Sequence, residues 1–227
     1  MGEIPRQEEP EQEKMEGNML DILLIRIPSK EEKQRVSYLE AHANDESFKA
    51  NHSFPDMLGK EKEVYNILRE KLNDKLLIDL GGGKSSLERV LENNKGIQLK
   101  GYLNVDKFPS NFNLDKKTPQ GFNFEEESIN GKTKTYVEAG MLDFLQYIEN
   151  HSIEAIALNG IDWEVIGSIE YHEELAKEIK RVLSPGGIVF GYDSIAINDL
   201  LQDDDFEIKS ESTGINIGAI LEKRERK

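Results

Sequence analysis

The sequence predicts a doubly wound α/β domain with a largely parallel sheet. Short apolar runs alternate with helical patterns from residue 75 onward, and three glycines follow the first run. A Pro-Gly-Gly stop separates the last long helix from a further apolar run. Parallel strands need crossover connections, so we expect helices on both faces of the sheet.

The predicted elements alternate along the chain. Parallel strands are expected at Lys75–Leu80, Gln98–Asp106, Thr135–Glu138, Ile153–Leu158 and Ile188–Tyr192. Helices are expected at Ser86–Asn94, at Leu142–Glu149 and before Pro185, where Leu175, Ile179, Val182 and Leu183 form an apolar stripe. A short helix at Ile197–Leu201 and an antiparallel pair at Phe206–Glu211 and Ile215–Glu222 close the domain.

Three regions precede or interrupt this pattern. Residues 1–17 are acidic and aperiodic and are expected to be a disordered tail. Residues 18–58 are expected to be an accessory segment, in which Ser29-Lys30-Glu31-Glu32 form a capping box that starts a helix toward Ala43. The main domain is expected over 59–227, beginning with a helix whose apolar face is Val64, Ile67, Leu68 and Leu72.

Residues 107–134 are expected to form a long insertion loop that contains Phe108, Phe112, Phe122 and Phe124. This loop is either a surface excursion or a lid over a substrate pocket.

Composition limits the partners. Acidic residues number 44 against 29 basic ones, which gives a net charge of -15 that repels duplex nucleic acid and leaves small molecules and proteins as partners. With no cysteine there is neither a disulfide nor a thiolate metal site, consistent with a reducing compartment. The start lacks a signal-peptide pattern and the apolar run Ile22–Ile25 is too short to span a bilayer, so we expect a cytoplasmic protein with no membrane association.

The most informative stretch is the loop after the first strand, Gly81-Gly82-Gly83-Lys84-Ser85-Ser86. Consecutive glycines between a buried strand and a helix let the backbone approach a ligand closely. A phosphate-binding P-loop would need its first glycine at Ile78, inside the strand, and a dinucleotide fingerprint would need a glycine at Ser86. Asp106, at the end of the second strand, suits a ligand with a ribose because its carboxylate can accept hydrogen bonds from both hydroxyls.

At this point the sequence resembles the class I S-adenosylmethionine-dependent methyltransferases. The resemblance lies in Asp79-Leu80-Gly81-Gly82-Gly83, in Leu103-Asn104-Val105-Asp106 and in Arg181-Val182-Leu183-Ser184-Pro185-Gly186-Gly187-Ile188-Val189-Phe190. It implies a seven-stranded Rossmann-like sheet with an antiparallel last strand, and S-adenosylmethionine as cofactor. It also implies that Asp79 and Gly81–Gly83 hold the methionine moiety and that Asp106 holds the ribose. The expected cofactor site further includes Ser85, Lys107, Met141, Leu142 and Asn159.

Two departures from the family pattern stand out. The family often places an acid after the third strand to accept the adenine amino group, and here that position is Gly140. Adenine contact would then fall to the backbone of Met141 and Leu142, or to Asp143. The segment Asn159-Gly160-Ile161-Asp162-Trp163 lacks the Asn-Pro-Pro-aromatic signature of enzymes that methylate amino groups on bases, which disfavours that subclass.

No catalytic residue is singled out, because methyl transfer needs little beyond in-line positioning of the acceptor. The candidates that follow the fourth and fifth strands are Asn159, Asp162, Tyr171, His172, Tyr192 and Asp193. His172 is expected to lie exposed at a helix start. No metal site is expected, because the four histidines lack ligand spacing and the acidic runs Glu125–Glu127 and Asp203–Asp205 fit solvated loops.

The sequence therefore favours a methyltransferase that acts on a small-molecule or protein acceptor. Two alternatives stay open: a non-catalytic interaction domain that retains the fold, and an NAD(P)-dependent oxidoreductase, suggested by the partial dinucleotide fingerprint.

Overall fold

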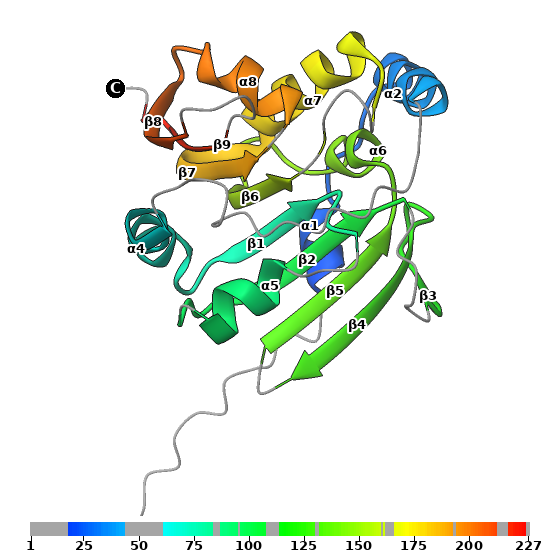
Figure 1. The fold of residues 1–227 in the computed structure, drawn as a ribbon. Coiled ribbons are helices and arrows are strands. Elements are labelled where there is room, and N and C mark those ends of the chain that lie inside the picture. Colours follow the sequence, from blue (N-terminus) through cyan, green and yellow to red (C-terminus); the bar gives the residue numbers. More distant parts are fainter. Residues whose placement is uncertain are drawn as a thin grey trace, which may run out of the picture.

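The computed structural model describes residues 18–43, 61–83, 87–94, 96–107, 114–129, 132–159, 161, 166–192, 194–212 and 218–225. The predicted acidic tail, 1–17, lies outside them. The described strands form one sheet in the order β3-β4-β5-β2-β1-β6-β7-β9-β8, with helices packed on both faces (Figure 1). Within this part of the chain no helix has both the length and the apolar composition that crossing a membrane would require.

Seven strands make up the core of the sheet. Across the sheet they are β5 (Lys132–Glu138), β2 (Gly101–Asp106), β1 (Leu76–Leu80), β6 (Ile153–Asn159), β7 (Leu183–Tyr192), β9 (Gly218–Lys223) and β8 (Phe206–Glu211). The first five are parallel, whereas β9 pairs antiparallel with both β7 and β8. The predicted doubly wound, Rossmann-like sheet with an antiparallel last strand is confirmed.

The insertion after β2 differs from its prediction. Instead of a loop throughout 107–134, its described residues include β3 (Lys116–Lys117) and β4 (Asn123–Ile129), which extend the sheet. Strand β4 pairs antiparallel with β5, and β3 pairs antiparallel with β4. Phe122 and Phe124 are buried, and the Phe122 ring packs 6.0 Å from that of Phe144, measured between centroids. Alternate positions of an extended chain share one face, and the face that carries Phe122 and Phe124 packs on the core. These two rings therefore belong to the core and not to a lid. Phe108 and Phe112 lie outside the described residues.

The two faces of the sheet carry different helices. One face is covered by α1 (Met19–Leu23), α2 (Lys30–His42), α6 (Met141–Leu145), α7 (Ile169–Val182) and α8 (Ile195–Leu201). The other is covered by α4 (Glu61–Leu72), the short α5 (Leu87–Arg89) and the π-helical turn η1 (Val90–Asn94), so the helix predicted at Ser86–Asn94 is irregular. Alternation along β1 explains the division, since Ile78 and Leu80 point into the first core and Leu77 into the second.

The N-terminal segment belongs to the same core as the sheet. Leu20, Leu24, Val36 and Leu39 are all at most 5% exposed and pack in the cluster that contains Ile78 and Leu80. The predicted capping box is present: the Ser29 hydroxyl accepts from the Glu32 amide at 3.1 Å, and the Ser29 amide donates to the Glu32 carboxylate at 2.7 Å. This packing brings the end of α2 to α6 and α7, at the arrowhead ends of the parallel strands (Figure 1).

Helix α7 ends before Pro185, as predicted, but Leu183, which was expected in its apolar stripe, belongs to the next strand. The helix stops at Val182, and the chain enters β7 at Leu183, ahead of Pro185. Leu183 pairs with Ile153 of β6, so the strand is longer than the apolar run Ile188–Tyr192.

Candidate functional site

The site lies where the chain reverses its direction across the sheet. From β1 the chain moves outward through β2 and β5, and then returns to place β6 on the other side of β1. In doubly wound sheets, ligands bind outside the carboxyl ends of the strands at such a switch point. The Gly81–Gly83 loop follows β1 there, beside the end of β2.

Two physical reasons favour glycine in the loop: positive φ values and close approach of neighbouring side chains. Gly81 and Gly83 have φ values of 69° and 52°, which disfavour residues with a Cβ. A Cβ on Gly82 would lie 2.7 Å from Asp79 Oδ2 and 2.9 Å from Asn104 Oδ1. A Cβ on Gly83 would meet nothing within 4 Å, so the described residues leave space on that side of the loop.

Strand β2 holds this loop in place. The Gly83 amide donates to Asp106 Oδ2 at 2.9 Å, and the Asn104 side-chain amide donates to the Gly83 carbonyl at 3.2 Å. Below them, the Gly81 amide donates to the Val105 carbonyl at 2.8 Å. The loop and the acid at the end of β2, which the sequence predicted as parts of one site, are therefore hydrogen-bonded to each other.

Asp79 is buried behind the loop. It is 2% exposed, and its carboxylate accepts a hydrogen bond from the Tyr102 hydroxyl on β2. Burial raises the pKa of Asp79 to about 7; the Tyr102 hydrogen bond acts against that rise, and the negative charge of Asp106 adds to it. A cationic group bound nearby would favour the ionised form of Asp79.

A third acid reaches the same edge of the sheet from the N-terminal segment. Glu40, near the end of α2, accepts hydrogen bonds through Oε1 from the Leu142 amide at 3.0 Å, the Asp143 amide at 3.2 Å and the Tyr171 hydroxyl at 3.0 Å. Its Oε2 lies 2.8 Å from the Lys107 ammonium. Two predicted cofactor residues, Lys107 and Leu142, are thus joined through an acid that the sequence did not indicate.

The first glycine of the loop is covered by the chain itself. The Ile161 side chain approaches to 2.5 Å from the position of a Cβ on Gly81, and the Met141 sulfur to 3.7 Å. Both side chains are at most 7% exposed. The open part of the loop is accordingly at Gly83.

The remaining candidates are dispersed. Asn159 and Tyr192 end β6 and β7, at the predicted edge of the sheet. His172, expected to be exposed, is fully buried in α7, where its Nε2 lies 2.8 Å from the Ile166 carbonyl oxygen. Burial follows from the helix, because His172 shares an inward face with Leu175 and Ile179. Three candidates lie outside the described residues: Ser85, Asp162 and Asp193.

No family model matches the sequence, and the curated proteins contain no match. Several solved structures that resemble the chain over most of its length are named as methyltransferases. The protein yhhF of Escherichia coli, assigned as a methyltransferase, is 10% identical over 78% of this chain and 90% of its own, with a TM-score of 0.49. The N-methyltransferase NodS of Bradyrhizobium japonicum WM9 is 8% identical over 74% and 97%, with a TM-score of 0.46. A protein of Listeria monocytogenes, assigned as an S-adenosylmethionine-dependent methyltransferase, is 12% identical over 72% and 99%, with a TM-score of 0.44.

Because these identities and TM-scores are low, the fold is assigned from the strand order and register, and the site from the contacts above. Sequence patterns did not single out Tyr102, Asn104 or Glu40. Tyr102 and Asn104 carried a usable signal, since they alternate with apolar residues on the strand that ends in Asp106. Glu40 carried none, because its partners at Lys107 and Leu142 are distant in sequence.

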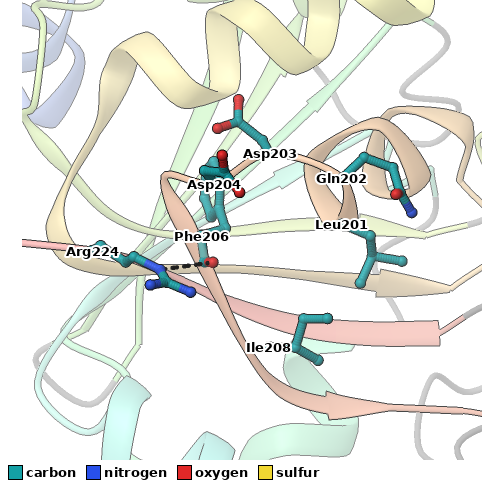
Figure 2. Close-up of a pocket in the computed structure, with 7 residues that line it drawn as sticks. All are labelled: Leu201, Gln202, Asp203, Asp204, Phe206, Ile208 and Arg224. Carbon is teal, nitrogen blue, oxygen red and sulfur yellow. Dashed lines mark hydrogen bonds between the residues drawn. The ribbon is translucent and has the colours of Figure 1, made fainter.

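A hollow of about 410 Å³ lies away from the glycine loop, at the other end of the strands (Figure 2). It is formed where α8 leads into β8, and one of its walls is fixed by a hydrogen bond from Arg224 Nε to the Phe206 carbonyl at 3.1 Å. Its lining residues are Leu201, Gln202, Asp203, Asp204, Phe206, Ile208 and Arg224. The strand β8 begins there and runs parallel to β7, so this hollow is remote from the glycine loop.

Proposed function

We propose that the chain is an S-adenosylmethionine-dependent methyltransferase that acts on a small-molecule or protein acceptor. The observation that carries this proposal is the hydrogen bond between the Gly83 amide and the Asp106 carboxylate. It fixes an accessible glycine backbone beside an acid that can accept hydrogen bonds from a ribose, which is the combination that an adenosine-bearing ligand needs.

The described residues fit that cofactor. The space beside Gly83 allows close approach to the backbone, and a carboxylate such as that of Asp106 offers about four acceptor positions. Asp79, buried behind the loop, would complement the positive charge of a methionine ammonium. Lys107, which follows Asp106, and Met141 and Leu142, at the start of α6, would line the rest of the site, with Ser85 and Asn159 as the remaining proposed contacts. Bound S-adenosylmethionine supplies a methyl group activated by its sulfonium.

The chain's own contribution would be binding and orientation. In-line placement of an acceptor against the methyl carbon supplies much of the rate enhancement in such reactions. The ends of β6 and β7, at Asn159 and Tyr192, are the places from which an acceptor would approach, because the glycine loop and Asp106 occupy the other side of the switch point. The net charge of -15 favours acceptors other than duplex nucleic acid.

A second candidate is a non-catalytic domain that keeps this fold. It is favoured by the packing of Ile161 and Met141 over Gly81, which leaves only part of the loop available to a ligand. A nicotinamide-dependent oxidoreductase has only the partial dinucleotide fingerprint in its favour. The antiparallel β9, which separates β7 from β8, differs from the parallel dinucleotide-binding sheet.

Titration calorimetry with S-adenosylmethionine, S-adenosylhomocysteine, NAD and NADP tests the proposal. Binding of the first two alone, followed by methyl transfer in a screen of small-molecule and protein acceptors, is the expected result. Binding without turnover would favour the non-catalytic domain, and binding of NAD or NADP alone would overturn the assignment.

A further inference from the structure

We infer that Glu40, from the N-terminal helix α2, is the residue that selects the nucleobase of the ligand, by accepting a hydrogen bond from an amino group on the base edge. This inference rests on the proposed function and extends it. Glu40 lies outside the strands and loops that form the rest of the site, and its carboxylate fits there because residue 140 is a glycine without a Cβ.

The order of the strands determines where a base would lie. A ligand held by the glycine loop of β1 and by Asp106 of β2 extends along neighbouring strand ends. Its non-base portion occupies the loop, so its base continues outward to the next strand, β5. The end of β5 is adjacent to Asp106, because Glu138 pairs with Asp106 and the Ala139 amide donates to the Asp106 carbonyl at 3.1 Å. The base would therefore lie against residues 139–142.

The Glu40 carboxylate occupies that position. Its Oε1 is held by two amides of the α6 start and by the Tyr171 hydroxyl, so the group is fixed in place although it comes from a different part of the chain. The side chain is only 12% exposed. A largely buried carboxylate that hydrogen bonds hold in one place can discriminate between a donor and an acceptor on a ligand.

The second carboxylate oxygen has capacity for a ligand donor. Oε2 is buried, and its neighbour among the described residues is the Lys107 ammonium, in an ion pair of 2.8 Å. A carboxylate offers about four acceptor positions, and Oε1 already takes three donors. A base amino group would take the place of the Lys107 ammonium at Oε2. The Lys107 side chain is 25% exposed and has a flexible stem, and its ammonium also donates to the Glu40 backbone carbonyl at 3.1 Å.

Gly140 supports this assignment independently. A Cβ at residue 140 would overlap the Glu40 carboxylate, so the glycine and the acid share one volume. The φ of Gly140 is -67°, which any residue can adopt, so close approach is the reason for a glycine here and not backbone conformation. A short acid at position 140 would place its carboxylate in the same volume, provided that Glu40 were shortened.

The test compares two ligands that differ at one position of the base. S-adenosylhomocysteine carries a 6-amino donor, and S-inosylhomocysteine carries a 6-oxo acceptor instead. We expect wild-type protein to prefer the amino form by about 10- to 100-fold in calorimetry, the effect of one hydrogen bond to a charged acceptor. Glu40→Gln should bring the preference close to 1, because an amide can both donate and accept. Glu40→Ala should lose affinity for the amino form, and the double variant Glu40→Ala with Gly140→Asp should regain the preference.

Two control variants distinguish selection of the base by Glu40 from a general loosening of the α2 packing. Glu31→Gln removes an exposed acid from the same helix, and Arg35→Met breaks an ion pair of 2.7 Å that joins α2 to Glu174 on α7. Both should leave the preference between the two ligands unchanged. Thermal unfolding of every variant identifies any that fails to fold, and the double variant then provides the decisive comparison.

The possible results separate the two proposals. If the wild type binds both ligands equally, or if the Glu40 variants weaken both by the same factor, Glu40 is a structural support and the inference is wrong while the proposed function stands. If the wild type binds neither ligand, the proposed function fails and the inference fails with it. Loss of the preference in Glu40→Gln together with its recovery in the double variant would support both.

Discussion

The amide of Gly83 donates a hydrogen bond to the carboxylate of Asp106 across 2.9 Å, which joins the loop after β1 to the end of β2. Neighbouring parallel strands place the two residues at one edge of the sheet, since Leu80 pairs with Val105. The acid therefore positions the loop and, in the proposed function, also faces the ribose.

Asp106→Ala should weaken S-adenosylhomocysteine binding by about 1–3 kcal/mol, because hydrogen bonds to a charged acceptor are lost. Calorimetry measures the change. The matched control is Glu138→Gln, which neutralises the acid that pairs with Asp106 on β5 and should leave the affinity within about twofold. Equal effects of the two substitutions would argue against a specific role for Asp106.

Alanine at Gly82 and at Gly83 should have different consequences. Gly82→Ala forces a Cβ against Asp79 and Asn104 and should lower the free energy of unfolding by about 1–3 kcal/mol, the usual cost of overpacking. Gly83→Ala costs about 1–2 kcal/mol through its left-handed backbone, but its Cβ enters the open side of the loop. Gly83→Ala should therefore reduce ligand affinity in addition to stability. Denaturant unfolding and calorimetry on both variants provide the comparison.

Asp79 makes the folding stability depend on pH. Its pKa is about 7 in the folded protein and near 3.8 when unfolded, so the folded state binds the proton more tightly. The cost of burying the group is absent below about pH 4, grows as the pH rises and is complete above about pH 7. Asp79→Asn keeps an acceptor for Tyr102 and removes this cost, which should raise stability at pH 8.5 by about 2–4 kcal/mol and leave it nearly unchanged at pH 4.

The measurement is the difference in unfolding free energy between wild type and Asp79→Asn at the two pH values. Asp74→Asn, on an exposed turn before β1, is the matched control and should show no such difference. A constant offset between wild type and Asp79→Asn at both pH values would show that Asp79 does not titrate as described.

Arg181 should be important for stability although it lies away from the ligand site. The Arg181 guanidinium donates to the Leu145 carbonyl at 2.8 Å and to the Ile148 carbonyl at 2.7 Å. It also forms an ion pair with Glu178. Arg181→Met would leave these groups without their charged donor and should cost about 2–3 kcal/mol in unfolding free energy. Lys177→Met, which removes an exposed cation from the same helix, should change it by less than about 0.5 kcal/mol.

Local sequence patterns predicted the parts of this fold that depend on neighbouring residues. The Ser29–Glu32 capping box, the buried strand β1 and the glycine loop each follow from a few adjacent positions. The proximity of Gly83 and Asp106 was also predictable, because consecutive parallel strands bring their carboxyl ends together.

Long-range pairing was not predictable in the same way. Strand β4 contains Glu125, Glu126 and Glu127, a run typical of solvated loops, and becomes a strand because Glu127 and Ser128 pair with residues of β5. The insertion of Glu40 at α6 joins residues 102 positions apart, and it depends on how α2 docks on the finished sheet. At Gly140 the sequence showed that an acid was missing, but not that another helix supplies one.

The most direct test of the central claim is the structure of the protein with bound S-adenosylhomocysteine. The expected result is density beside Gly83, with both ribose hydroxyls within hydrogen-bond distance of the Asp106 carboxylate. A ligand bound elsewhere, or a crevice in which Ile161 and Met141 remain packed over the loop and exclude the ligand at saturating concentration, would contradict it.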